Sequence, residues 1–439
     1  MKNKGRAVTL AGIVINLALG ILYTWSIFKG AIKSSIERGG EGAFNWDPST
    51  INDPYATCCL VFAFSMILAG KCQDKLGPRV TALIGGVLVG TGFIWISQTT
   101  EYVNWIIGFG VLVGTGIGFG YSSATPPALK WFPPQKAGMI AGLVVSGFGL
   151  ASVYIAPLAK YFLGIWTLQQ SMLFFGVSFI FVVCGASLLL VNPPAGYKPP
   201  PPKPREVRLE DVLKFESFFS DHFPDSDKGG TASGSIITGR DMTPSQMMTT
   251  INFYMLWLIY LVGAGAGLMV IGSVAGMAKA SMGESAFLVV AVMAIGNAGG
   301  RIIAGVLTDK IGPTITMIIM LLFQAVLMFA AIPIVGAENA SPLLLVLLAT
   351  FIGFNYGTNL SLFPLFTKSL WGLKNFGTNY GIVFTAWGVG GFIMSRLSQM
   401  LTAGTGSYSS SFAIAGVLLI LGIMLTLILQ TRISKKANV

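Results

Sequence analysis

Residues 285–307 read SAFLVVAVMAIGNAGGRIIAGVL and are followed at once by Thr308, Asp309 and Lys310. A stretch of this length and apolarity crosses the hydrocarbon core of a bilayer as one helix. Arg301 lies inside the stretch, and its distance from Asp309 along the helix axis is about 12 Å. An arginine at that depth costs from about 2.5 to more than 10 kcal/mol. Its presence therefore indicates a function.

The residues around Arg301 favour a binding role. Asn297 lies one turn earlier on the same helix face, and Gly296, Gly299 and Gly300 leave that face open. A guanidinium is suited to a carboxylate because its planar N–H groups match the two oxygens. We hypothesise that Arg301 faces a water-filled central cavity and binds the carboxylate of a small anion, with Asn297 assisting.

The composition is that of a membrane protein. The chain has 439 residues, of which 53% are hydrophobic and 10% are charged, and its mean hydropathy is +0.73. A soluble domain would carry about 25% charged residues. The net charge of +11 fits basic loops of a membrane protein, so we expect a lipid bilayer partner and no nucleic acid. The four cysteines lack metal-ligand spacing, so we expect no metal, no cofactor and no disulfide.

Twelve apolar runs predict twelve membrane spans and an all-α fold. A Pro-rich, charged linker at 193–248 separates an N-terminal half at 1–192 from a C-terminal half at 249–439, and a short amphipathic helix is expected near 208–220. The predicted spans are 8–30, 54–70, 79–98, 104–128, 137–161, 170–191, 249–278, 285–307, 313–334, 342–366, 376–400 and 410–430.

Lysine and arginine are concentrated in alternate loops. Both termini, the central linker and the loops after the second, fourth and tenth spans are basic, whereas most of the opposite loops hold almost no Lys or Arg. Because positive loops stay in the cytoplasm, we expect both termini to be cytoplasmic. We further expect a monomer in the plasma (inner) membrane.

The two halves are internal repeats. GKCQDKLGP at 70–78 recurs as GVLTDKIGP at 305–313, and GFGY at 118–121 recurs as GFNY at the same offset. A Gly-x-x-x-Gly motif beginning at Gly138 recurs from Gly377 after a small shift. Two homologous bundles with a site at their interface are typical of transporters.

The repeated loop resembles the signature loop of the major facilitator superfamily, a resemblance that covers essentially the whole chain. It implies twelve helices in two pseudo-symmetric six-helix bundles. Physically, charges at a helix end can pair with a neighbouring helix end and hold one conformation. The alternative is that they are ordinary interfacial charges. The candidate gating residues are Asp74, Lys75, Arg79, Asp309 and Lys310.

Within that superfamily, three further stretches are similar to the branch of oxalate:formate antiporters and monocarboxylate transporters, and to its bacterial monocarboxylate transporter homologues. They are LYTWSIF at 22–28, the segment from Trp131 to Gly142 and the segment from Asn379 to Gly388. The resemblance implies that Arg301 holds a carboxylate.

Two departures from that branch narrow the expected substrate. Trp387 stands where oxalate exchangers have a lysine, so one cation is left for one carboxylate. Asn297 stands where proton-coupled animal relatives have an aspartate, and an amide cannot titrate. The sequence therefore predicts a lactate-like or pyruvate-like monocarboxylate and leaves the proton-carrying group open.

Weaker candidates line the same site. Tyr121 and Tyr356 are repeat-related and can offer hydroxyls to the substrate, although helix packing explains them equally well. Asn359 shares a helix face with Tyr356. Phe384 and Trp387 are expected to form an apolar wall beside the substrate's short tail, with simple packing as the alternative.

The function that these observations favour is secondary active transport of a small monocarboxylate by alternating access, coupled to a proton. The first alternative is a carboxylate exchanger of the oxalate:formate kind. The second is a membrane sensor or scaffold that uses its central linker. The sequence contains no Walker motif and no nucleophile–base pair, so we expect that the protein is not an enzyme.

Overall fold

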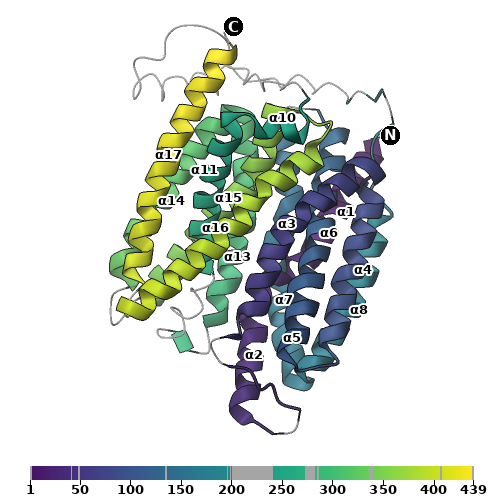
Figure 1. Ribbon diagram of the computed structural model, residues 1–439, viewed down its shortest axis with the longest axis vertical. Coiled ribbons are helices and arrows are strands. Elements are labelled where there is room, and N and C mark those ends of the chain that lie inside the picture. The colour runs from purple at the N-terminus through teal and green to yellow at the C-terminus, as the bar shows by residue number, and fades with distance from the viewer. Residues whose placement is uncertain are drawn as a thin grey trace.

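The helices form two groups that stand side by side in a computed structural model. The N-terminal group, purple to blue in Figure 1, lies beside the C-terminal group, which runs from green to yellow. Both chain termini lie at the same end of the molecule, which we call the terminal side; the other end is the opposite side. The structure describes residues 2–40, 42–47, 50–133, 136–194, 196–197, 199, 241–271, 282–283, 286–335, 341–405 and 408–437.

The N-terminal group supplies the first six spans. Prolines at the first helical turns of its second and third spans fit there because their missing N–H would be unpaired anyway. Its elements are α1 (Lys2–Leu19), η1 (Gly20–Thr24), α2 (Trp25–Arg38), α3 (Asp53–Leu76), α4 (Pro78–Ile96), α5 (Tyr102–Trp105), η3 (Ile106–Val113), α6 (Gly114–Trp131), α7 (Ala137–Ile165) and α8 (Leu168–Ser187).

The C-terminal group begins with a short helix and continues with six long ones. Its elements are α10 (Pro244–Met248), α11 (Ile251–Ile271), α13 (Ala286–Ile311), α14 (Pro313–Val335), α15 (Pro342–Trp371), α16 (Phe376–Thr405) and α17 (Ser409–Ala437). The predicted fold of twelve membrane-spanning helices in two bundles is confirmed. Two predicted segments, the end of the seventh span at 272–278 and the helix near 208–220, lie outside the described residues.

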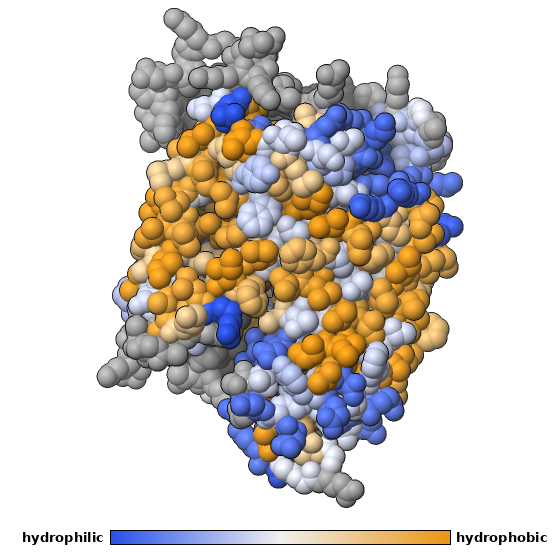
Figure 2. Space-filling model, in the orientation of Figure 1, coloured by the Kyte–Doolittle hydropathy of each residue, from blue (hydrophilic) through white to orange (hydrophobic). Residues whose placement is uncertain are grey.

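Eleven segments of the described chain are long and apolar enough to cross a membrane. The twelfth span is α16, a 30-residue helix whose polar residues and glycines reflect its position at the interface, where it packs on α3. Figure 2 shows an apolar band around the middle of the molecule, with hydrophilic residues gathered towards its two ends. Large side chains in this band face outward, including Phe181, which is 75% exposed. The protein is therefore an integral membrane protein.

The first span is interrupted near its middle. A five-residue 3₁₀ segment, η1, separates α1 from α2. Gly20 opens this segment with its backbone against the carbonyl of Phe148 and the side chain of Ala151 in α7, where a Cβ atom would clash. The close approach and the tighter winding bring Tyr23 of η1 towards the centre of the molecule.

Residues that precede the first span of the C-terminal half contact this half as well. The carboxylate of Asp241 accepts hydrogen bonds from the backbone N–H groups of Leu373 and Lys374 at 3.0 and 3.1 Å. The N–H of Met242 donates to the carbonyl of Trp371 at 3.1 Å. The end of the predicted linker is thus attached to the loop between α15 and α16.

Candidate functional site

Arg301 lies at the centre of the interface between the two halves. Its side chain is 0% exposed, so it is enclosed by protein and does not face the water-filled cavity that the sequence predicts. Its Nε donates to Oδ1 of Asn297 at 2.9 Å, its Nη1 donates to the carbonyl of Val145, and its Nη2 donates to the hydroxyl of Tyr23 at 3.4 Å. The guanidinium carbon stands 5.8 Å from the ring centroid of Phe148. A helix of the C-terminal half therefore presents its arginine to α7 and η1 of the N-terminal half.

These contacts leave the guanidinium able to bind an anion. Among the described residues its hydrogen-bond partners are an amide, a backbone carbonyl and a phenol, and none of them is acidic. A guanidinium has five N–H groups, so three donated bonds leave two. Two N–H groups are the number that a carboxylate accepts in a paired arrangement. A buried charge without a counterion is unfavourable, so binding of an anion here would relieve that cost.

A chain of hydrogen bonds runs from Arg301 through Tyr23 of the N-terminal half and back to α15 and α16 of the C-terminal half. The hydroxyls of Tyr23 and Tyr356 lie 2.6 Å apart, and Nε1 of Trp387 donates to the hydroxyl of Tyr356 at 2.9 Å. The two phenols accept from Arg301 and Trp387 and carry two protons between them. The bond between the phenols uses one proton, so the second can be donated to a substrate oxygen.

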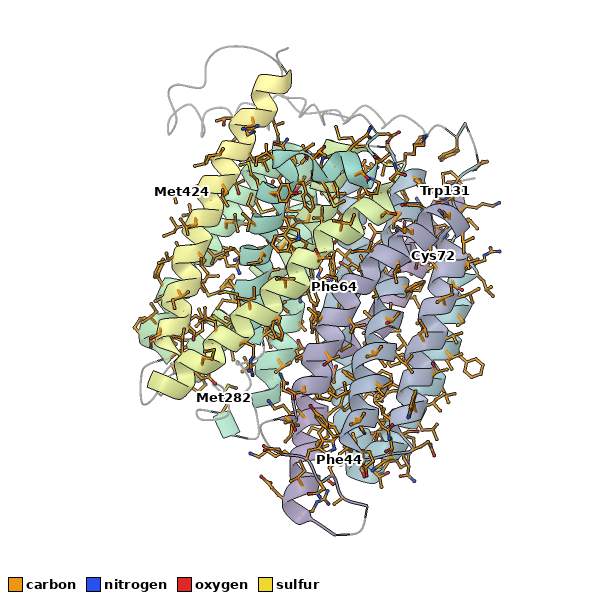
Figure 3. The ribbon with its side chains drawn as sticks, viewed as in Figure 1. Phe44, Phe64, Cys72, Trp131, Met282 and Met424 are labelled. Atoms are coloured by element: carbon orange, nitrogen blue, oxygen red, sulfur yellow. The ribbon has the colours of Figure 1, made fainter. Side chains whose placement is uncertain are left out.

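Aromatic side chains pack around this chain of hydrogen bonds. Phe384 stacks on Trp387 with ring centroids 5.1 Å apart, and it faces Phe62 and Tyr121 at 5.1 and 5.6 Å. Tyr121 in turn lies 5.5 Å from Phe148. These rings come from both halves, and they are buried. Figure 3 shows side chains filling the space between the two groups of helices.

One weaker candidate lies elsewhere. Asn359 is 2% exposed, but its Nδ2 donates to the carbonyl of Asn355 in its own helix at 3.1 Å. Its Oδ1 faces Gly263 of α11. The described contacts of Asn359 are therefore within the C-terminal half, and the structure does not bring it against Arg301.

The terminal side of the interface is held by two reciprocal helix caps. Asp74, at the end of α3, accepts from the N–H groups of Gly377 and Thr378, which begin α16, at 3.1 and 2.9 Å. Asp309, at the end of α13, accepts from the N–H groups of Gly138 and Met139 at 2.8 and 2.9 Å. Each carboxylate faces the positive end of a helix in the other half.

Glycines let these helices touch along their backbones. The backbone of Gly70 meets that of Gly377, and Gly138 meets Gly305. Further towards the centre, Gly142 lies against the carbonyl of Arg301. A Cβ atom at any of these positions would clash with backbone of the other half. The α3–α16 and α7–α13 contacts therefore close the terminal side of the interface tightly.

The basic residues predicted to act with these aspartates lie outside the contact. Lys75 and Lys310 are exposed, and Arg79 donates to the carbonyl of Leu188 within the N-terminal half at 2.6 Å. Lys130 and Lys368, which the sequence analysis missed, are the cations that interact electrostatically with Asp74 and Asp309, respectively. Their signal in the sequence is that each lies near the end of the fourth helix of its half.

The opposite side is hollowed near the start of α3. A cavity of about 440 Å³ lies there, lined by Asp53 and Thr57 of α3, by Tyr102 of α5 and by Phe392 of α16. The hydroxyl of Tyr102 donates to the Asp53 carboxylate at 2.8 Å. All of its lining residues except Phe392 belong to the N-terminal half.

Sequence reasoning also missed several aromatic residues of the site. Tyr23 and Phe148 contact Arg301 directly, while Tyr260 and Tyr380 surround Phe384. The only signal for Tyr23 was its place in a stretch that resembles related transporters. Tyr380 has the same signal, because it lies in the segment from Asn379 to Gly388. Phe148 and Tyr260 lie on helices that are rich in aromatic residues or glycine, so nothing distinguishes them.

Two bundles that meet at a buried cation correspond to the plan of a membrane transporter. The family model of the Major Facilitator Superfamily matches residues 7–394 and 245–439. The chain belongs to this superfamily.

Three curated relatives share most of this chain. The uncharacterized MFS-type transporter YhjX of Escherichia coli (strain K12) is 27% identical over 395 residues, which are 88% of this chain and 85% of that protein. The oxalate:formate antiporter of Oxalobacter formigenes is 24% identical over 88% of this chain and 81% of its own. Human monocarboxylate transporter 11 is 27% identical over 80% of this chain and 68% of its own.

The fold is also similar to solved transporter structures. The proton:xylose symporter XylE, bound to 6-bromo-6-deoxy-D-glucose, superposes with a TM-score of 0.65. The match covers 96% of this chain and 95% of the symporter at 13% sequence identity. At that identity the likeness concerns the fold alone.

Proposed function

We propose that this protein is a secondary active transporter of small monocarboxylates, of the lactate or pyruvate kind, that couples their movement to protons by alternating access. The observation that carries the proposal is Arg301, a fully buried cation whose described partners are all neutral. Its two remaining N–H groups and the spare phenol proton of the Tyr23–Tyr356 pair match a carboxylate with an oxygen on the neighbouring carbon.

The single cation favours one carboxylate. Trp387, at the position where oxalate exchangers have a lysine, is neutral and donates its indole N–H to Tyr356. A dicarboxylate bound at this site would leave its second charge among the rings of Phe62, Phe384 and Trp387. Burying an unpaired carboxylate costs several kcal/mol (order of magnitude), so monocarboxylates should be strongly preferred.

The proton requires a different carrier from that of the aspartate-bearing relatives. Asn297 cannot titrate, and its Oδ1 is occupied by Arg301. We propose that the proton travels with the substrate, whose carboxylate gains and loses Arg301 as a partner, or that it uses Asp74 and Asp309 at the terminal side. Carboxylate exchange without a proton is the second candidate, because the oxalate:formate antiporter is among the relatives.

Transport would proceed by rocking of the two halves, 1–192 and 249–439, around Arg301, with the linker at 193–248 joining them. In this proposal the terminal side is cytoplasmic, because the basic loops lie there. The protein would act as a monomer in the plasma (inner) membrane.

A substrate panel in proteoliposomes tests the proposed function. Uptake of lactate, pyruvate, formate and oxalate would be measured with and without an imposed pH gradient. We expect lactate or pyruvate uptake that rises several-fold when the outside is acidic. Counterflow of carboxylates that ignores the pH gradient would establish the exchanger instead. Absence of uptake for the whole panel, by protein that is folded and correctly inserted, would contradict both and favour the sensor or scaffold.

Introducing a second cation at the site should shift the preference from monocarboxylates towards oxalate. In the variant Trp387→Lys, the ammonium would stand beside Tyr356 and could pair with the second carboxylate of oxalate. We expect oxalate uptake to rise at least about 10-fold relative to lactate, since a paired buried charge replaces an unpaired one. Trp387→Phe, which removes the same indole without adding charge, is the control. An unchanged oxalate-to-lactate ratio in Trp387→Lys would show that Trp387 does not face the bound substrate.

A further inference from the structure

Three buried tyrosine hydroxyls lie together without hydrogen bonds of normal geometry. They belong to Tyr121 of α6, Tyr260 of α11 and Tyr380 of α16, whose side chains are 3%, 0% and 6% exposed. The hydroxyl of Tyr380 is close enough to those of Tyr121 and Tyr260 to interact with both. Buried polar groups in proteins are almost always paired, so hydroxyls that make no hydrogen bond of normal geometry are available to the acceptor oxygens of a guest.

The cluster lies on the terminal side of the Arg301 site. Along α16, Tyr380 comes just after Thr378, which the Asp74 cap holds, and two turns before Trp387, a distance of about 10 Å. Along α15, the ring of Phe363 stacks on Tyr260 with centroids 3.7 Å apart. Phe363 is again two turns, about 10 Å, on the terminal side of Tyr356. Two helices therefore place the cluster between the Arg301 site and the closed terminal side.

Phe384 separates the cluster from the Arg301 site. Its ring centroid is 5.6 Å from Tyr121, 6.1 Å from Tyr260 and 5.7 Å from Tyr380. On its other side it contacts Phe62 and Trp387. Rotation of one ring would therefore connect the two positions.

We propose that the hydroxyls of Tyr121, Tyr260 and Tyr380 form a second, transient subsite for the carboxylate of the transported anion, on its path between Arg301 and the terminal side. This inference rests on the proposed function and adds a position to it. Three phenol O–H groups can donate to the two oxygens of one carboxylate.

The charges around the cluster favour weak, transient binding of an anion. Phenols are neutral, so they hold an anion less tightly than a guanidinium does. Tyr121 and Tyr260 lie within the electrostatic reach of Arg301, so an anion that moves to the cluster remains attracted by the same positive charge. The anion crosses the closed part of the interface without being left unpaired.

The subsite predicts a kinetic asymmetry between the two sides of the membrane. We would replace Tyr260 and Tyr380 by Phe, singly and together, and measure the KM for lactate from each side in vesicles of defined orientation. We expect the KM from the terminal side to rise at least about 10-fold in the double variant, because hydrogen bonds to a charged group are lost. The KM from the opposite side, where the anion reaches Arg301 first, should change less than about 2-fold.

Tyr254→Phe is the matched control, because Tyr254 belongs to the same helix as Tyr260 but is 53% exposed. Equal increases of KM from both sides would place the hydroxyls in the Arg301 site and overturn the subsite. Unchanged KM values on both sides would show that the hydroxyls hold only water and would overturn it too. Wild-type lactate uptake, measured in the same vesicles, tests the proposed function separately.

Discussion

Replacing Arg301 by Ala should abolish monocarboxylate uptake while the protein still inserts and folds. Losing one partner of a buried, hydrogen-bonded charge pair costs about 2 to 5 kcal/mol, which corresponds to at least about a 30-fold loss and up to several thousand-fold in affinity. Because no acidic residue among its described partners is left unpaired by the change, the folded state should tolerate it. Initial uptake of labelled lactate or pyruvate in proteoliposomes, normalised to inserted protein, measures the loss.

Two further variants define what Arg301 supplies. Arg301→Lys keeps the charge but loses the planar donor fork, so its uptake should fall between those of wild type and Arg301→Ala. Arg396→Ala removes an exposed arginine of α16 and should transport normally. Near-normal uptake by Arg301→Ala, with Arg396→Ala behaving alike, would end the proposal that Arg301 binds the substrate.

Removing both helix caps should open the terminal side. A carboxylate at a helix N-terminus contributes about 0.5 to 2 kcal/mol. In the double variant Asp74→Ala/Asp309→Ala, the free energy that favours the closed terminal side should therefore fall by about 1 to 4 kcal/mol. That shift corresponds to a change of about 5- to several hundred-fold in the ratio of closed to open molecules. Spin labels at Lys71 and Arg432, one in each half, would then report a new population at longer distance.

The control for this experiment is Asp241→Ala. The Asp241 carboxylate also accepts two backbone N–H groups, but both belong to its own half, so its loss should leave the distance distribution unchanged. A double-cap variant with the wild-type distribution would contradict the role of Asp74 and Asp309 in holding the closed state. The measurement requires a background in which the four cysteines are replaced.

The spans could be predicted from the sequence because each depends on the chain's local composition. An apolar run of bilayer length has few stable alternatives to a helix. The predicted span at 137–161, for example, lies within α7, which continues to Ile165. The segments that were predicted too short are those whose helices continue beyond the apolar run, such as α3, which reaches Leu76.

The residues of the candidate site also differ in whether the sequence alone could identify them. Arg301 and Asn297 could be identified together because a four-residue spacing places them on one face of one helix, and their hydrogen bond joins them. Tyr23 could not be identified as their partner, since it lies in a different half and reaches Arg301 through the 3₁₀ turn that begins at Gly20. No local pattern reports such a turn.

The structure places the charged residues of the repeated loop in different surroundings. The repeated Asp-Lys pair identifies both aspartates as candidates. Each of them lies against a helix end of the other half. The neighbouring Lys75 and Lys310 are exposed instead, because adjacent residues on a helix point about 100° apart and cannot all face one partner. Lys130 and Lys368, from other helices, occupy the positions near the aspartates.

The sequence by itself determined that this chain crosses a membrane in two repeated halves and that a single arginine lies deep within it. The length of an apolar run, the position of a charge within it and the repetition of a motif can all be read from the sequence. None of them requires knowledge of how the helices pack. Only the tertiary structure decided that Arg301 meets Val145 and Tyr23 of the other half, and that three tyrosines from separate helices gather beyond Phe384. Such contacts depend on the angles and positions at which the helices pack. Those are set jointly by side chains that are far apart in the sequence.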